Sequence, residues 1–163
     1  MEKLFCLGMI FLLFVSCDGN KKDEVTNVDT AQEFSLGKLK KPIATNPKAK
    51  EILNKWPEFN ALETSFNALY NVNSQEDLTL VIEDLIEKQK LLAASNYPLQ
   101  FNVAQIKSRQ NVFKSFVLKT KGDLEYRIAP QESVKEMVTA YNALRNQFNV
   151  ITNNPLDIKS LLE

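Results

Sequence analysis

Hydrophobic residues recur every three or four positions through most of the chain after residue 46, a spacing that places them on one face of an α-helix. The first such stretch carries Ile52, Trp56, Phe59, Leu62, Phe66 and Leu69. Asn46 and Pro47 precede it, and these residue types favour a helix cap and a first helical turn. Pro57 lies inside the stretch, so the pattern predicts either one kinked helix or a short helix followed by a second.

Three further stretches repeat this spacing. The second contains Leu78, Val81, Ile82, Leu85, Gln89 and Leu92. The third contains Val103, Ile106, Gln110, Phe113, Val117, Thr120 and Leu124. The fourth follows Pro130 and contains Val134, Met137, Tyr141, Leu144, Phe148 and Ile151, and a short tail helix is expected beyond it, through Leu162. Regular alternation of threes and fours with short connections predicts an all-α, antiparallel (up-down) four-helix bundle over residues 46–163.

A β-hairpin is the alternative for residues 116–128. Phe116–Leu118 and Leu124–Ile128 are short apolar runs on either side of Lys121-Gly122-Asp123. The helical spacing crosses Gly122 without losing phase, and a glycine inside a long helix costs only about 1 kcal/mol. The pattern therefore favours a helix here.

The N-terminal region has the composition of a secretion signal. Lys3 precedes the apolar run Leu4–Val15. This run of roughly 12 residues is typical of a secretory signal peptide, and it is too short for a membrane-spanning helix, which needs about 20. The motif Phe14-Val15-Ser16-Cys17 then resembles the lipobox of bacterial lipoproteins. The resemblance implies that residues 1–16 are removed and that Cys17 carries covalent lipid.

Residues 17–45 are rich in charge and poor in apolar side chains, so we expect the lipidated cysteine to be followed by a flexible, disordered linker. The cluster Lys21–Glu24 resembles the segment that directs some lipoproteins to the cell surface, whereas Asp18 resembles an inner-membrane retention signal. We expect a lipid anchor in the bacterial cell envelope. The outer membrane is favoured, and the sequence leaves open whether the protein faces the periplasm or the cell surface.

Composition excludes several classes of chemistry. The chain has 20 basic and 20 acidic residues, which argues against nucleic acid as a partner. Histidine is absent, which excludes Ser-His-Asp and Cys-His catalysis and di-iron sites built on Glu-x-x-His. Cys6 lies in the predicted signal, so Cys17 is the only cysteine expected after cleavage. We therefore expect no catalytic residue, metal or cofactor, apart from the covalent lipid on Cys17.

Three side chains are candidates for contact with a partner. Arg109 and Arg145 lie off the apolar stripes, and each could bind an acidic group of a partner or form a salt bridge between helices. Trp56 could be a binding hot spot or a core residue.

The roles of two groups of polar residues stay open. Glu83 and Glu87 are one helical turn apart and could share a cation or form a solvated face. Asparagines are frequent at positions 60, 67, 142, 146 and 149, where some could form a polar ridge for protein contact.

The sequence thus predicts a membrane-tethered, non-catalytic helical lipoprotein that contacts other envelope proteins. The alternative is a module that holds an apolar or amphipathic ligand between its helices, in a cavity lined by Phe113, Phe116, Tyr141 and Phe148. A carboxylate-based hydrolase is a third, weaker hypothesis.

Overall fold

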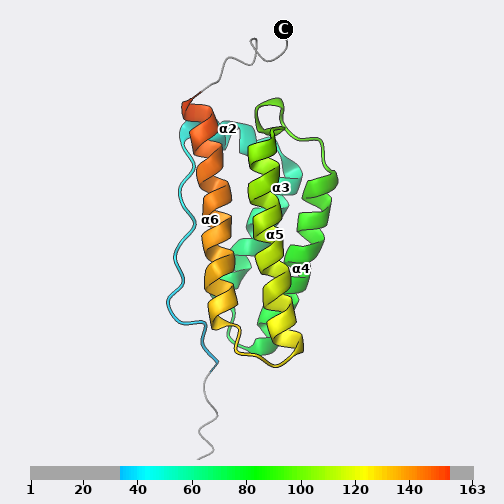
Figure 1. Cartoon of the computed structure of the whole chain (residues 1–163). Coiled ribbons are helices and arrows are strands. Elements are labelled where there is room, and N and C mark those ends of the chain that lie inside the picture. Colours follow the sequence, from blue (N-terminus) through cyan, green and yellow to red (C-terminus); the bar gives the residue numbers. More distant parts are fainter. Residues whose placement is uncertain (1–33, 155–163) are drawn as a thin grey trace, which may run out of the picture. The chain divides into compact units, whose positions relative to one another are not determined.

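The computed structural model describes residues 34–154, and every structural statement below concerns this range. Within it the helices are α2 (Pro47–Asn54), α3 (Pro57–Ala68), α4 (Gln75–Ala94), α5 (Ala104–Glu125) and α6 (Gln131–Asn153), with short 3-10 turns η2 (Leu69–Asn71) and η3 (Leu99–Phe101). Figure 1 shows α3 to α6 packed side by side in alternating directions, with α2 at one end. The predicted all-α, antiparallel four-helix bundle is confirmed. The predicted signal, Cys17 and tail helix lie outside the described residues.

The apolar stripes of the four long helices meet in one core. Phe59, Leu85, Phe113 and Leu144, one from each helix, are at most 1% exposed. Aromatic rings fill the centre, where Tyr141 stacks on Phe66 with ring centroids 3.7 Å apart. Contacts of this kind add to the free energy gained from burial alone. None of the helices within residues 34–154 has the length and apolar character needed to span a bilayer.

Pro57 starts a new helix instead of kinking a longer one. The side-chain oxygen of Asn46 accepts a hydrogen bond from the Ala49 N–H at 2.7 Å and caps α2, as expected. The helix ends at Asn54, and Pro57 occupies the first turn of α3. Proline lacks an N–H and its ring obstructs the preceding turn, which explains the break. The break turns Trp56 into the core, where it is 2% exposed.

Residues 116–128 do not form a hairpin. Helix α5 continues through Gly122 and ends at Glu125, as the unbroken apolar spacing predicted.

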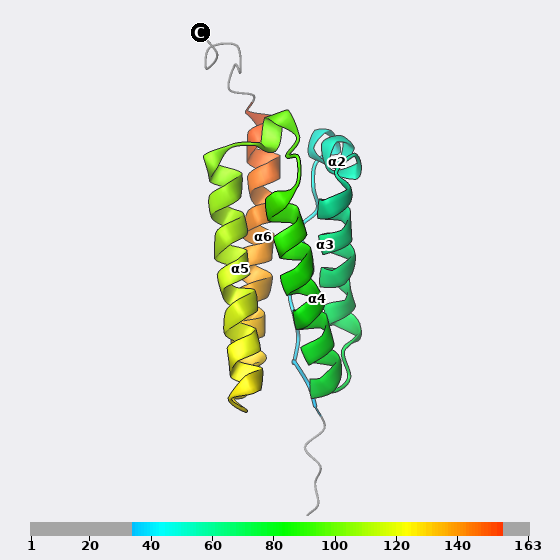
Figure 2. The ribbon, with the colours of Figure 1, turned by 90° about the vertical axis from the view of Figure 1, so that its right-hand side faces the viewer.

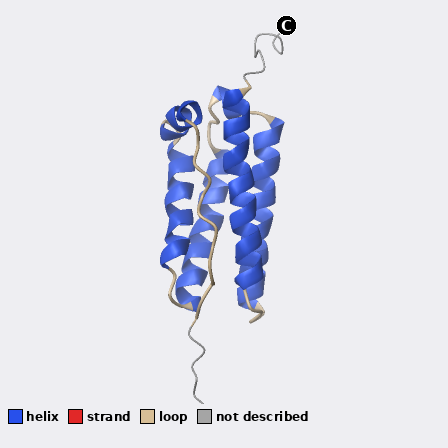
Figure 3. Ribbon diagram, turned by 90° about the vertical axis from the view of Figure 1, so that its left-hand side faces the viewer, coloured by secondary structure: helices blue, strands red, loops and turns tan. Residues whose placement is uncertain are grey.

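Residues 34–45 form an extended segment, here called the strap, that lies along the bundle. The side chain of Gln131, at the start of α6, donates to the Ser35 carbonyl at 3.3 Å. Near the other end of α6, the Asn46 N–H donates to Asn149 Oδ1 at 2.7 Å. The strap therefore runs parallel to α6, and Figure 3 shows it crossing the face of the bundle between α6 and the α2–α3 side. The predicted flexible linker is wrong for residues 34–45, because Leu36 is buried at 7% exposure and the backbone finds polar partners.

One core side chain has no polar partner. Gln89 of α4 is 1% exposed, and neither its Nε2 nor its Oε1 forms a hydrogen bond within the described part of the chain. A buried amide loses its hydrogen bonds to water on folding, and here no hydrogen bond within the protein replaces them. Gln89 is therefore a local weakness in the core.

We expect Gln89→Met to raise the free energy of unfolding by about 1–2 kcal/mol, because it removes a dehydrated amide at nearly constant volume. Gln110→Met on α5 is the matched control. It should lower stability by about 1 kcal/mol, since Gln110 accepts a hydrogen bond from Tyr97. Urea denaturation measures both. Equal losses in the two variants would mean that Gln89 has a partner in solution.

Candidate functional site

Arg145, one of the three candidates for contact with a partner, is buried in the structure. Arg145 is 8% exposed. Its Nε donates to the Ile43 carbonyl at 2.6 Å, and its Nη1 forms an ion pair with Glu63 of α3. Arg145 thus joins α6, the strap and α3. Its guanidinium is engaged inside the protein, so the structure favours the internal salt bridge over contact with a partner.

Two asparagines of the predicted polar ridge hold the strap. Asn142 Oδ1 accepts from the Ile43 N–H at 2.7 Å, and Asn142 Nδ2 donates to the Lys41 carbonyl at 3.2 Å. Asn149 accepts from the Asn46 N–H and donates to the Ala44 carbonyl at 3.0 Å. Each amide binds the strap through one N–H donor and its acceptor oxygen, as a neighbouring strand would. Asn142 and Asn149 therefore serve internal pairing.

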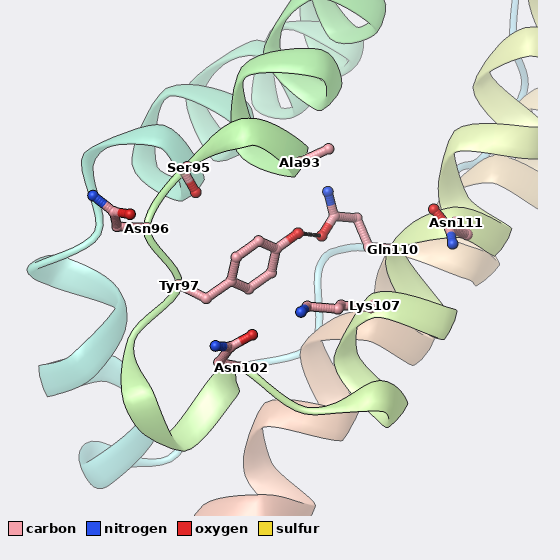
Figure 4. A pocket seen from close by; sticks show the side chains of 8 residues that line it. All are labelled: Ala93, Ser95, Asn96, Tyr97, Asn102, Lys107, Gln110 and Asn111. Atoms are coloured by element: carbon pink, nitrogen blue, oxygen red, sulfur yellow. Dashed lines mark hydrogen bonds between the residues drawn. The ribbon is translucent and has the colours of Figure 1, made fainter.

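A polar pocket lies at the connection between α4 and α5. We call it the amide pocket; it has a volume of about 530 Å³ and is lined by Ala93, Ser95, Asn96, Tyr97, Asn102, Lys107, Gln110 and Asn111. Figure 4 shows Tyr97 reaching across from the connection toward Gln110 on α5, with Lys107 and Asn111 on the same helix. The pocket brings together the side-chain amides of Asn96, Asn102, Gln110 and Asn111, and we take it as the candidate site.

Core residues fix the back of this pocket. The Tyr97 hydroxyl donates to Oε1 of Gln110, a residue only 3% exposed. Burial raises the pKa of the Tyr97 phenol above its ordinary value, so the hydroxyl stays protonated at neutral pH and keeps donating. The Tyr97 ring packs against Trp56 at 4.8 Å between centroids, and the Trp56 Nε1–H donates to Ser95 Oγ at 2.9 Å. Trp56 thus supports the pocket from inside the core and is not exposed to a partner.

The charge at the pocket is positive. Lys107 Nζ lies 5.3 Å from the centre of the Tyr97 ring, and the lining includes no Asp or Glu. The pocket is therefore suited to hydrogen-bond acceptors, carboxylates included.

A second, larger groove of about 670 Å³ is lined by residues of the same connection and of α2, and it shares Asn96 with the amide pocket. It lies between α2 and η3 and includes Leu99, whose side chain is 69% exposed. The two hollows give this end of the bundle an uneven surface with both polar and apolar parts.

The other predicted site residues are dispersed. Arg109 is exposed on α5 and is not among the lining residues of either hollow. Glu87 pairs with Lys88 at 3.4 Å, and no group of three or more acidic, cysteine or histidine side chains placed to hold a metal occurs in residues 34–154. The pattern of the carboxylates is that of a solvated helix face.

The predicted ligand cavity is filled by its own side chains. Phe113 and Tyr141 pack at 5.3 Å between ring centroids, and Phe148 packs against Phe101 at 4.6 Å. Phe101, Phe113, Tyr141 and Phe148 are at most 1% exposed, whereas Phe116, the remaining residue predicted to line the cavity, is only partly buried. The amide pocket was missed because its key residue, Tyr97, lies in a connection outside the periodic stripes; only the polar Gln110 within an apolar stripe hinted at it.

Comparisons of the chain with protein-family models, with curated proteins and with solved structures found no match.

We expect Asn142→Ala to destabilise the protein by about 1–3 kcal/mol, because it leaves two backbone groups of the strap without partners. Hydrogen exchange at the Ile43 amide should accelerate more than exchange in α5. Asn146→Ala, one turn further along α6 and exposed, is the matched control and should change stability by less than about 0.5 kcal/mol. Equal effects of the two substitutions would show that the strap is not held by Asn142.

Proposed function

We propose that this protein is a lipid-anchored, non-catalytic lipoprotein of the bacterial cell envelope that acts by binding another envelope protein. The lipobox-like motif ending at Cys17 supports the anchor. The absence of histidine from the sequence supports a non-catalytic role. The observation that carries the proposal is the position of the amide pocket relative to the start of the strap.

The strap and the pocket mark opposite ends of the bundle. Ser35, at the start of the strap, lies beside Gln131 at the start of α6. The connection that forms the pocket packs near the end of α6, where Phe101 contacts Phe148. Figure 2 shows this separation along the long axis. Helix α6 has 23 residues and is therefore about 34 Å long. A lipid on Cys17 would hold the strap end near the membrane and leave the pocket on the far side.

The pocket suits a protein partner better than a buried small molecule. It is open and lined by amides, with exposed Leu99 nearby, a combination of polar and apolar surface typical of non-obligate interfaces. Lys107 favours an acidic or carbonyl group of the partner at the centre of the contact. We place that group against Lys107.

Cys17→Ser should move the protein from the membrane fraction to the soluble fraction, because several acyl chains hold a protein stably whereas none remain in the variant. Immunoblotting of fractionated cells measures the change. A variant that remains fully membrane-bound would contradict the lipid anchor. A Cys6→Ser variant, altered within the predicted signal, is the control and should fractionate like the wild type.

A photo-crosslinking residue at position 111 in the pocket should capture a discrete envelope protein in intact cells. Adding Lys107→Glu should reduce the adduct at least tenfold, because charge reversal costs more than about 1.4 kcal/mol at an acidic contact. Lys114→Glu, exposed on the same helix outside the pocket, is the control. The contact at the amide pocket is excluded if no adduct forms or if both charge reversals act alike.

A further inference from the structure

The connection between α5 and α6 exposes two large apolar side chains at the end of the bundle. Tyr126 is 79% exposed and Ile128 is 56% exposed. Arg127 lies between them with φ of 56°, in the left-handed region that glycine or asparagine usually occupies at this position. We call residues 126–128 the apolar tip.

Hydrogen bonds hold the tip in a defined conformation. The Ile128 N–H donates to the Asp123 carbonyl at 2.7 Å, and the Arg127 N–H donates to the Leu124 carbonyl at 3.3 Å. These are the two bonds of a Schellman motif, in which an apolar residue at the position of Ile128 commonly packs on the last turn of the helix. The corresponding positions here are Gly122 and Asp123. They offer Ile128 no apolar surface, so its side chain projects outward from a backbone that is fixed.

The tip lies at the end of the bundle where the strap begins. Ile128 precedes α6 by only two residues, and Gln131 of α6 donates to Ser35 of the strap. Figures 1 and 2 show the α5–α6 connection and the first part of the strap at the same end, opposite to α2. The tip and the first described residues of the strap therefore lie at the same end of the bundle.

We propose that the apolar tip seats on the lipid surface, with Tyr126 and Ile128 entering the boundary between headgroups and acyl chains and Arg127 close to lipid phosphates. This inference rests on the lipid anchor at Cys17 in the function proposed above. Residues 17–33, behaving as the predicted flexible linker, would have a root-mean-square end-to-end distance of about 23 Å, less than the length of the bundle. This average distance favours the orientation in which the strap end is nearer to the membrane than the pocket end. A tyrosine, an aliphatic residue and an arginine together are typical of side chains at this interface.

Charges at this end decide how the contact depends on lipid composition. Glu76 and Asp77 in the first turn of α4, and Glu132 in the first turn of α6, oppose an anionic surface. Arg127 favours it, as does Lys121, which pairs with Glu125 at 3.5 Å. The four acidic residues named here outnumber Arg127 and Lys121, so charge does not attract this end to an anionic surface, and the contact is driven by apolar burial. It should form on zwitterionic lipid and persist at high salt.

Labelling at a single cysteine tests the tip. Ile128→Cys places a thiol at the tip, and Leu99→Cys, 69% exposed at the opposite end, is the matched control. The lipidated variants are labelled with an environment-sensitive fluorophore and reconstituted into phosphatidylcholine vesicles with or without brominated lipid. We expect a blue-shifted emission at position 128 that brominated lipid quenches severalfold, in low and high salt. Position 99 should stay water-like and unquenched.

Two results overturn the inference while leaving the anchor intact. The first is water-like emission at position 128 in vesicle-bound protein. The second is a blue shift that brominated lipid does not quench, which would assign the tip to a protein or to a second copy of the chain. An additional Tyr126→Ser substitution in the Ile128→Cys protein should reduce the quenching at least twofold if lipid contact is correct.

Failure of the anchor gives a different signal. Since Cys17 is the only cysteine expected after cleavage, each lipidated variant should take up one label per chain. Two labels per chain, together with protein that does not remain on vesicles, would show that Cys17 is free, and would overturn both the function proposed above and the seating of the tip.

Discussion

An extended segment packed on a helical bundle needs partners for its backbone, and this requirement organises one whole side of the protein. A helix pairs its N–H and C=O groups internally, whereas residues 34–45 have no neighbouring strand to pair with. Asn142, Arg145 and Asn149 of α6 supply those partners. On the other side of the strap, the Tyr70 hydroxyl donates to the Lys40 carbonyl at 2.6 Å. The strap then serves as a fifth element of the bundle, and Leu36 joins the core.

The strap also gives the bundle a direction. Because it runs parallel to α6, the start of the strap lies at one end of the bundle and the amide pocket lies at the other. In the proposed function the first end faces a membrane and the second faces a partner protein. This orientation would place an apolar surface against lipid and a polar surface against a protein partner, which matches the apolar tip and the amide pocket. The tip presents Tyr126 and Ile128 on a fixed backbone, whereas the pocket presents amides and Lys107.

Helical periodicity predicted the part of the core that the four long helices supply, because the burial of a residue inside a bundle follows from its position on its own helix. Leu36 and Phe101, which lie outside those helices, were not predicted as core residues. Ile106, Phe113 and Val117 of the third stripe are all buried. Gln110 was placed correctly in that stripe, yet its bond to Tyr97 was not foreseen, since Tyr97 lies in a connection without periodicity. For Trp56 and Arg145, residue type left two roles open: contact with a partner, or an internal role in the core or in a salt bridge. Burial of both by the surrounding helices and the strap gives them internal roles.

The sequence by itself determined the helical class, the antiparallel order of the stretches and the absence of histidine chemistry, because each of these depends on local spacing or on composition. It also contains the lipobox-like motif from which the anchor is proposed. Only the tertiary structure decided that residues 34–45 are part of the domain, that Arg145 faces inward and that a pocket forms beside Tyr97. The physical reason is distance along the chain: Ile43 meets a side chain 102 residues later, and no periodic pattern encodes a contact between an irregular segment and the polar edge of a helix.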